Sequence, residues 1–403
     1  MHGPKFSIHG SSQPSAHLYL RSVSDADRLR AYPWLSVRCP AGDGWIEGVE
    51  GNFAASLLER KRRSSRCRGV FLRGMQLTDK FGRVINDLRL SVTDRCNYRC
   101  VYCRSGNNGP QFAELSLQDY LRISRVFVSL GITKIRLTGG EPLLRRDLLD
   151  LIRELRALRT VDGEPLDIAI TTNGHLLAEM AQPLKDAGLD RITVSMDAVD
   201  PDLFARITRV PNSYQKVIAG IRAAKAVGLA PVKVNCVLLR GFNEEQIVPF
   251  GKFAREEDVV VRFIEFMPLE EDRLWTPEIV VPLKEIVGKL NEYLPLKQIE
   301  HGHSETARRY RFEDGRGEIG IIAPVSLPFC GACSRIRVTS DGKIRTCLFS
   351  VREHDLAGLL FHHAPDEEIA DRIRYAIANK EERHHIGEPD FLPASRTMVH
   401  IGG

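Results

Sequence analysis

Two groups of three cysteines are the residues of this chain best suited to chemistry. The first group lies in the run Cys96-Asn97-Tyr98-Arg99-Cys100-Val101-Tyr102-Cys103. A cubane [4Fe–4S] cluster normally has four cysteine ligands, so Cys96, Cys100 and Cys103 would leave one iron open to an outside ligand. A zinc site would usually need a second pair of ligands to complete its tetrahedron. The spacing therefore favours an iron–sulfur cluster over zinc.

The second group has a C-x2-C-x13-C spacing and consists of Cys330, Cys333 and Cys347. Three thiolates again suggest a cluster with one open iron. A zinc knuckle is the alternative, because His354 is available as a fourth ligand. Between these cysteines lie Arg335 and Arg337, which face the same side if the segment is a strand. Because a guanidinium donates two hydrogen bonds to a phosphate at once, the pair suggests a phosphate-binding cavity.

Two further features point to a ligand in the interior. The turn Thr138-Gly139-Gly140-Glu141-Pro142 follows a predicted strand, and glycines let the backbone approach a ligand closely. Alone it could be an ordinary turn, but beside the first cysteine group it indicates binding. Arg89 and Arg136 each sit inside an apolar strand. Both should project into the interior, where an anionic ligand or an internal ion pair must compensate the charge.

The elements that position these residues alternate between strands and helices. The predicted strands are 87–93, 134–138, 167–172, 191–196, 231–238 and 259–265, and the predicted helices include 116–130, 147–158, 177–187, 214–227 and 244–255. This rhythm predicts a parallel sheet. Six units are too few for an eight-stranded barrel, so we expect an α/β fold with a partial (β/α)6 barrel. Its functional residues should lie at the carboxyl ends of the strands.

We expect three parts along the chain: an extension over 1–74, the barrel over 75–267, and an α+β region over 268–403. The extension lacks periodic apolar residues and contains a basic cluster, so we expect it to be disordered or to precede the true start at Met75. In the last part we expect a helix near 282–293, strands around 318–348, and a helical tail over 351–390. The second cysteine group falls in this part.

Composition limits the class of protein. The 403 residues are 43% hydrophobic and carry a net charge of +5, with no apolar run long enough to span a membrane. Six of the nine cysteines fall in the two groups, which indicates metal ligands in a reducing compartment. We therefore expect a cytoplasmic protein. The mild charge and few aromatic residues give nucleic-acid binding little support.

The first cysteine group and the glycine turn resemble those of the radical S-adenosylmethionine (SAM) superfamily. The resemblance implies a partial barrel in which the amino and carboxylate groups of SAM chelate the open iron of the first [4Fe–4S] cluster. It also implies SAM contacts at Tyr102, Gly140, Ser195 and Met267.

Within that superfamily, residues 75–403 resemble the GTP 3′,8-cyclase family of molybdenum cofactor biosynthesis. The resemblance rests on both cysteine groups, the glycine turn, the stretches Val232–Asn235 and Arg262–Glu265, and the Gly402-Gly403 end. It implies a second [4Fe–4S] cluster that holds the purine of GTP, and a C-terminal tail that reaches the active site. The implied GTP contacts are Arg89, Arg136, Thr171, Lys233, Arg335, Ile336 and Arg337.

The activity that this resemblance implies is a lyase reaction. A 5′-deoxyadenosyl radical from SAM abstracts H3′ of GTP, and the product is (8S)-3′,8-cyclo-7,8-dihydroguanosine 5′-triphosphate. Implied partners are an electron donor, a downstream cyclic pyranopterin monophosphate synthase and a second copy of the chain. Two alternatives stay open: another radical SAM enzyme with an auxiliary cluster, and a zinc-dependent nucleic-acid binding module that uses the basic cluster at 60–66.

Overall fold

The computed structural model describes residues 76–103, 112–270, 273, 275–300, 302, 304–389 and 391–402, which belong to one compact unit. The predicted extension 1–74, the predicted start at Met75 and the terminal Gly403 lie outside the described residues. Among the residues described, no helix is both long and apolar enough to cross a membrane.

One sheet runs through the described part of the chain. Its strands are β1 (Asp87–Ser91), β2 (Lys134–Thr138), β3 (Asp167–Thr172), β4 (Arg191–Ser195), β5 (Lys233–Leu238), β6 (Val260–Glu265), β7 (Leu296–Ile299), β8 (Arg308–Phe312), β9 (Glu318–Ile322), β10 (Arg335–Val338), β11 (Lys343–Arg345) and β12 (His354–Asp355). Their order is β12-β11-β10-β1-β2-β3-β4-β5-β6-β9-β8-β7.

The six predicted strands form the parallel centre of this sheet, and the C-terminal region extends it at both edges. Strand β10 pairs in parallel with β1, and β9 pairs in parallel with β6. Antiparallel strands follow outward on each side, β11 and β12 beyond β10, and β8 and β7 beyond β9. The strands of the region predicted over 268–403 thus belong to the same sheet as the strands of the barrel.

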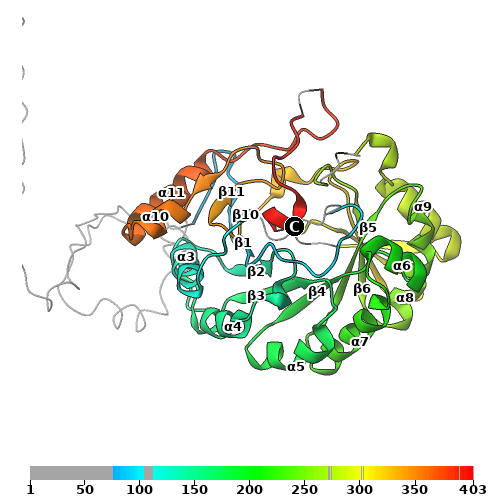
Figure 1. The fold of residues 1–403 in the computed structure, drawn as a ribbon. Helices are drawn as coiled ribbons and strands as arrows, with labels where there is room; N and C mark the ends of the chain where they lie inside the picture. Colours follow the sequence, from blue (N-terminus) through cyan, green and yellow to red (C-terminus); the bar gives the residue numbers. More distant parts are fainter. Residues whose placement is uncertain are drawn as a thin grey trace, which may run out of the picture. The chain divides into compact units, whose positions relative to one another are not determined.

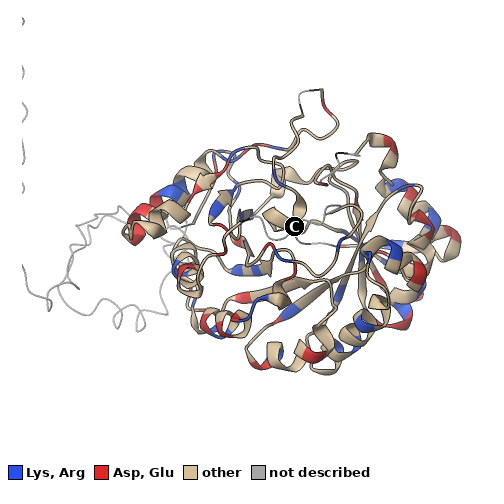
Figure 2. Ribbon diagram, viewed as in Figure 1, with Lys and Arg blue, Asp and Glu red and all other residues tan. Residues whose placement is uncertain are grey.

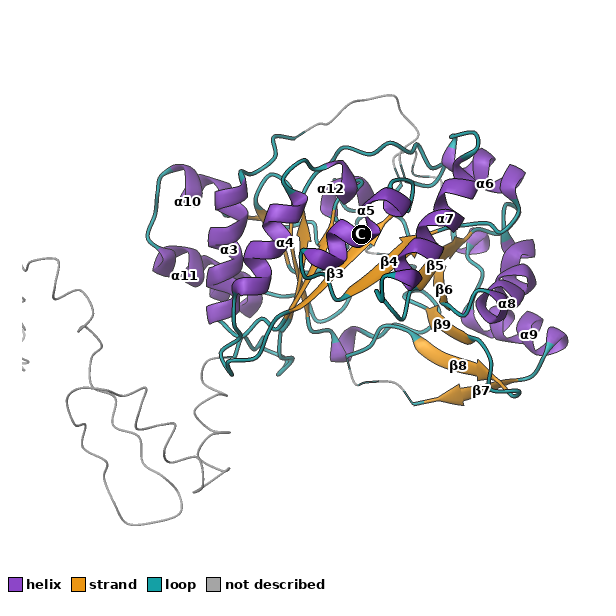
Figure 3. Ribbon diagram, turned by 90° about the horizontal axis from the view of Figure 1, so that it is seen from below, coloured by secondary structure: helices purple, strands orange, loops and turns teal. Residues whose placement is uncertain are grey.

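Helices cover the outer face of the strands, as Figures 1 and 3 show. They are α3 (Leu117–Ser129), α4 (Leu148–Ala157), α5 (Leu177–Asp186), α6 (Pro201–Thr208), α7 (Ser213–Ala226), α8 (Ile247–Glu256), α9 (Leu283–Tyr293), α10 (Ala357–Phe361) and α11 (Asp366–Ala378). The C-terminal helix α12 (Met398–Ile401) instead lies inside the ring of strands in Figure 1. Short 3-10 turns are η1 (Pro142–Leu144), η2 (Glu244–Gln246), η3 (Pro277–Ile279) and η4 (Cys330–Ala332).

Apolar periodicity explains which faces are buried. In α4 the buried residues are Leu148, Leu151, Ile152 and Leu155, the spacing of one helix face. In β1 the side chains of Leu88 and Leu90 are fully buried in the core. Because successive side chains of a strand point to opposite faces, Arg89 between them faces the interior of the barrel.

Most predicted elements are present, and the differences are local. The helical tail predicted over 351–390 forms helices only in α10 and α11. The hairpin β7–β8 and the short helices α6 and α12 were not predicted. Helix α6 begins after Asp200, whose carboxylate accepts a 2.7 Å hydrogen bond from the backbone N–H of Leu203, with Pro201 in the first turn. That is an N-terminal capping pattern.

A buried carboxylate joins the barrel to the C-terminal region. Glu265, at the end of β6, is fully buried. It accepts hydrogen bonds from the backbone N–H groups of Leu283 (3.0 Å), Val325 (2.9 Å) and Ser326 (2.8 Å). These bonds compensate the buried charge and fix the start of α9 and the segment that follows β9.

Candidate active site

A cavity of about 570 Å³ lies inside the barrel, and both cysteine groups line it. The first group follows the carboxyl end of β1. The second group begins near the amino end of β10, because Cys333 comes two residues before Arg335, which pairs with the first residue of β1, Asp87. The two groups therefore lie toward opposite ends of β1, whose five residues span about 16 Å at about 3.3 Å each.

The thiols of the first group are close to one another. Burial raises the pKa of the Cys100 thiol well above its usual value, and charges on Asp197, Cys103 and Cys96 raise it further. Burial also raises the pKa of Cys96 to about 11. Buried thiols with raised pKa values lose their protons when they bind a metal, because metal ligation requires the thiolate.

The glycine turn packs directly against the segment that leads to Cys96. The backbone N–H of Gly140 donates to the carbonyl of Thr93 (2.8 Å), and that of Glu141 donates to the carbonyl of Arg95 (2.7 Å). A Cβ at Gly139 would lie 2.3 Å from the Thr93 carbonyl oxygen, which no side chain can tolerate. The two glycines therefore have a structural role in holding the cysteine segment, besides the predicted role in SAM binding.

The other residues predicted to contact SAM also line the cavity. Tyr102 donates a 2.6 Å hydrogen bond to Asp197, and Ser195 ends β4. Met267 follows β6 and packs against a small apolar cluster that includes Ile401. Burial raises the pKa of Asp197 to about 6.

The second cysteine group has a different electrostatic environment. Although burial alone would raise the pKa of the Cys333 thiol, the charges of Arg335 and Lys380 lower it to about 6. Cys333 is therefore a thiolate at neutral pH, the form that binds metal. The charges of both Cys330 and Cys347 interact with that of Cys333, and all three residues line the cavity.

The zinc alternative is not supported by the geometry. In the described part of the chain, no three Cys, His, Asp or Glu side chains are grouped closely enough to hold a single metal ion. His354, the predicted fourth ligand, lies in β12 and packs its ring edge-on against Tyr375, with 5.8 Å between ring centroids.

Three arginines form a row across adjacent strands between the two cysteine groups. Arg89 of β1 is in register with Arg337 of β10 and with Arg136 of β2. Residues in register point to the same face, and all three line the cavity. Burial and then the charges of Arg337 and Arg136 lower the pKa of Arg89. An anion bound beside this row would relieve the mutual repulsion of the three charges.

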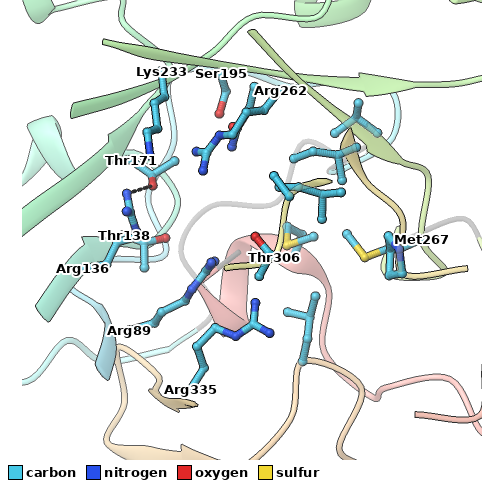
Figure 4. A pocket seen from close by; sticks show the side chains of 18 of the residues that line it. Arg89, Arg136, Thr138, Thr171, Ser195, Lys233, Arg262, Met267, Thr306 and Arg335 are labelled. Atoms are coloured by element: carbon cyan, nitrogen blue, oxygen red, sulfur yellow. Dashed lines mark hydrogen bonds between the residues drawn. The ribbon is translucent and has the colours of Figure 1, made fainter. Parts of the chain in front are cut away.

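Figure 4 shows that the basic lining continues onto the next strands. Arg136 donates to the hydroxyl of Thr171 (3.3 Å), as the dashed line in the figure marks. Arg262 donates to the hydroxyl of Thr193 (3.2 Å). Burial, followed by the charge of Arg262, lowers the pKa of Lys233 to about 8.

Sequence reasoning did not include Arg262 among the ligand contacts. Burial, then the charges of Arg136 and Arg191, lower its pKa to about 9. Its side chain stands between Val261 and Phe263, both buried, which is the pattern by which Arg89 and Arg136 were selected. Ile336 shows the opposite outcome, because its side chain lies in the core on the other face of β10, so only its backbone can approach a ligand in the cavity.

Two buried donor atoms without a hydrogen-bond partner bear on whether an anionic ligand fits the cavity. Among the described residues, the Nε atoms of Arg89 and Arg262 are buried and have no hydrogen-bond partner. Buried polar groups are normally hydrogen-bonded. A polyphosphate in the cavity would supply the acceptors. Figure 2 shows Lys and Arg on the inner strands and charges of both signs on the outer helices.

The C-terminal segment lies at the carboxyl ends of β1 and β2. The carbonyl of Gly402 accepts a 2.7 Å hydrogen bond from Arg337. A Cβ on Gly402 would lie 3.0 Å from that of Ser91 and 3.2 Å from Cγ2 of Thr138. Its φ of +68° also favours glycine. This part of the predicted tail therefore contacts Arg337 and Thr138, two residues that line the cavity.

Comparison with known proteins shows which proteins share this fold. The profile of the radical SAM superfamily matches residues 90–254, and that of Molybdenum Cofactor Synthesis C matches residues 259–386. Streptococcus suis SuiB bound to S-adenosylmethionine shares the fold with a TM-score of 0.51 at 14% identity, over 80% of this chain and 75% of SuiB. The chain is thus a member of the radical SAM superfamily, with a partial barrel and a C-terminal extension.

Curated relatives narrow the family. The GTP 3′,8-cyclase of Xanthomonas axonopodis pv. citri (strain 306) is 44% identical over 308 residues, which are 75% of this chain and 91% of the relative. The GTP 3′,8-cyclase of Syntrophomonas wolfei subsp. wolfei (strain DSM 2245B / Goettingen) is 41% identical over 331 residues, which are 81% of this chain and 100% of the relative. This chain belongs to the GTP 3′,8-cyclase family. Membership implies an iron–sulfur cluster and SAM.

Proposed function

We propose that this chain is a GTP 3′,8-cyclase, which converts GTP to (8S)-3′,8-cyclo-7,8-dihydroguanosine 5′-triphosphate in the first step of molybdenum cofactor biosynthesis. The observation that carries the proposal is the cavity itself. It has a cysteine group toward each end and a row of arginines in register between them. Family membership supports the same activity.

Cys96, Cys100 and Cys103 hold the first [4Fe–4S] cluster in this proposal. When bound, that cluster and SAM supply the 5′-deoxyadenosyl radical that abstracts H3′ of GTP before C3′ bonds to C8. Tyr102, Gly140, Ser195 and Met267 position SAM. Asp197 holds the Tyr102 hydroxyl in place through its 2.6 Å hydrogen bond, and the Gly140 turn holds the cysteine segment.

Cys330, Cys333 and Cys347 hold a second [4Fe–4S] cluster whose open iron takes the purine of GTP. Since the two groups lie toward opposite ends of β1, a nucleotide bound at the second group extends back along the strand toward the first. The triphosphate is held by basic and hydroxyl side chains on the inner strands, with Ile336 contributing its backbone. These side chains are Arg89, Arg136, Thr171, Lys233, Arg262, Arg335 and Arg337.

The reaction implies partners. Cleavage of SAM consumes an electron, so we infer an external one-electron donor. The cyclic triphosphate must pass to a second enzyme that rearranges it to cyclic pyranopterin monophosphate, and we infer a homodimer and a cytoplasmic location from the family resemblance and the reduced cysteines.

A product assay tests the activity. Anaerobically reconstituted protein is incubated with SAM, dithionite and GTP deuterated at C3′, and products are analysed by mass spectrometry. We expect an isomer of GTP together with 5′-deoxyadenosine that carries the deuterium. Deoxyadenosine without change in GTP would identify another radical SAM enzyme with an auxiliary cluster. Protein that holds both clusters but forms neither compound would overturn the proposal.

Binding of GTP should weaken above pH 8 because Lys233, with its pKa of about 8, loses its charge there. Affinity measured by isothermal titration between pH 7 and pH 9.5 should fall more steeply for the native protein than for Lys233→Met. The stability of the apo protein should show the opposite trend and rise with pH over this range. The unfolded lysine keeps its proton up to its ordinary pKa of about 10.4, so the unfolded state binds more protons between these values and stability rises with pH. If the GTP affinity fell equally steeply with pH in the native protein and in Lys233→Met, the role of Lys233 in binding would be wrong.

A further inference from the structure

A buried lysine contacts the segments that carry the second cysteine group. The side chain of Lys380, which follows α11, is only 2% exposed. Its ammonium donates to the carbonyl of Arg335 (3.2 Å) and to that of Thr346. Arg335 comes two residues after Cys333, and Thr346 directly precedes Cys347. One side chain thus ties together the two segments that carry those cysteines.

A buried arginine holds the remaining cysteine of the group. Arg83 lies in the turn before β1 and is 7% exposed. It donates to the carbonyl of Cys330 (2.9 Å), and to those of Glu381 (2.5 Å) and Glu382 (2.6 Å), the residues that follow Lys380. Asp79 pairs with it at 2.5 Å. Through Arg83 and Lys380, each of the three cysteine segments is fixed by a buried cation from outside the group.

Among the described residues, the hydrogen bonds of the Lys380 ammonium go to no carboxylate. Its two hydrogen-bonded partners are neutral carbonyls. The carboxylate of its neighbour Glu381 accepts instead from the hydroxyls of Thr346 (2.6 Å) and Ser350 (2.5 Å). Burying an ammonium is costly unless an anion compensates it. Besides the carboxylate of Glu381, whose charge interacts with that of Lys380, the anionic groups within the range of this ammonium are the thiolates that a cluster would bind.

We propose that Lys380, supported by Arg83, is a positioning residue for the second iron–sulfur cluster: it fixes the three cysteine segments in the ligating arrangement and stabilises the cluster's negative charge from the side opposite the cavity. The inference rests on the proposed function, since it requires that Cys330, Cys333 and Cys347 hold a cluster. A nearby buried cation favours the more negative, reduced form of a cluster. Loss of Lys380 therefore moves the midpoint potential of the second cluster to a more negative value.

The test uses the full chain with Cys96, Cys100 and Cys103 replaced by alanine, so that only the second cluster contributes to the signal. Lys380→Met is compared with Lys380→Arg and with Lys284→Met, an exposed lysine on α9. Iron content, the rate of iron loss to a chelator, and the midpoint potential from a titration followed by electron paramagnetic resonance are measured. We expect a more negative midpoint and faster iron loss for Lys380→Met alone, with Lys380→Arg close to the parent.

The outcomes separate the two proposals. A parent that binds no iron would overturn the second cluster, and with it the role of Lys380. A parent that binds about four irons per chain, while Lys380→Met keeps the same midpoint and chelation rate, would overturn the role of Lys380 alone. If Lys380→Met does not fold, Arg83→Gln decides, because it removes the bond to the Cys330 carbonyl and leaves Lys380 in place. Iron loss from Arg83→Gln at the parent rate would then contradict the proposal.

Discussion

Replacement of Cys96, Cys100 and Cys103 by alanine is expected to abolish cleavage of SAM, while the same replacement of Cys330, Cys333 and Cys347 is expected to leave cleavage detectable and abolish the cyclic product. The reason is the separation of the groups: the first lies beyond the carboxyl end of β1, and the second lies beside its amino end. Loss of one set of ligands should leave the other set's geometry intact. Deoxyadenosine and the GTP isomer are quantified separately in each variant.

The control for this pair is Cys236→Ala. That thiol is fully buried in β5 and belongs to neither group, so the variant should keep iron content and both products near native values. Each triple variant should lose about half of the iron. If the second triple variant made cyclic product at the native rate, the role of its cysteines in holding GTP would be wrong.

Sequence reasoning located the cavity because its residues violate local patterns. A charge inside an apolar strand, as at Arg89 and Arg136, has to point away from the core, and the structure confirms that both line the cavity. The same rule would have found Arg262, which interrupts the apolar strand Val260–Glu265 in the same way. Periodicity thus predicts which face a residue occupies, and this part of the site was accessible from the sequence.

Long-range pairing was not accessible in this way. Nothing in the sequence pattern of 318–338 indicates that β9 pairs with β6 and that β10 pairs with β1. Strands β10 and β1 are more than two hundred residues apart in the sequence. That pairing creates the register of Arg337 with Arg89. Lys380 was also missed, since a lysine after a helix is ordinarily a solvated residue, and only the tertiary fold buries it beside the cysteines.

Arg262→Met is expected to weaken GTP binding and to stabilise the apo protein at the same time. Arg262 is partly buried, its buried Nε has no hydrogen-bond partner among the described residues, and the charges of its neighbours Arg136 and Arg191 lower its pKa. Because desolvation and the two arginine charges outweigh the opposite effect of Glu305, replacing the charge by an apolar side chain should raise the free energy of unfolding by about 1 kcal/mol. Loss of a charge-assisted contact to phosphate should cost about 3 kcal/mol of binding, or about 100-fold in affinity.

Arg191→Met is the matched comparison, because it removes a cavity arginine that has a carboxylate partner. Arg191 donates to Asp167 through Nε at 3.1 Å, so its loss leaves that carboxylate unpaired and should lower stability. Urea unfolding of the two apo variants should therefore move in opposite directions, while titration with GTP shows the larger loss for Arg262→Met. If both variants were destabilised alike, the charge of Arg262 would be compensated within the protein, and the cavity would not be strained in the absence of nucleotide. Changes of opposite sign in the free energy of unfolding would show that charge repulsion destabilises the empty site. Relief of this repulsion by a triphosphate would then contribute to the affinity for GTP.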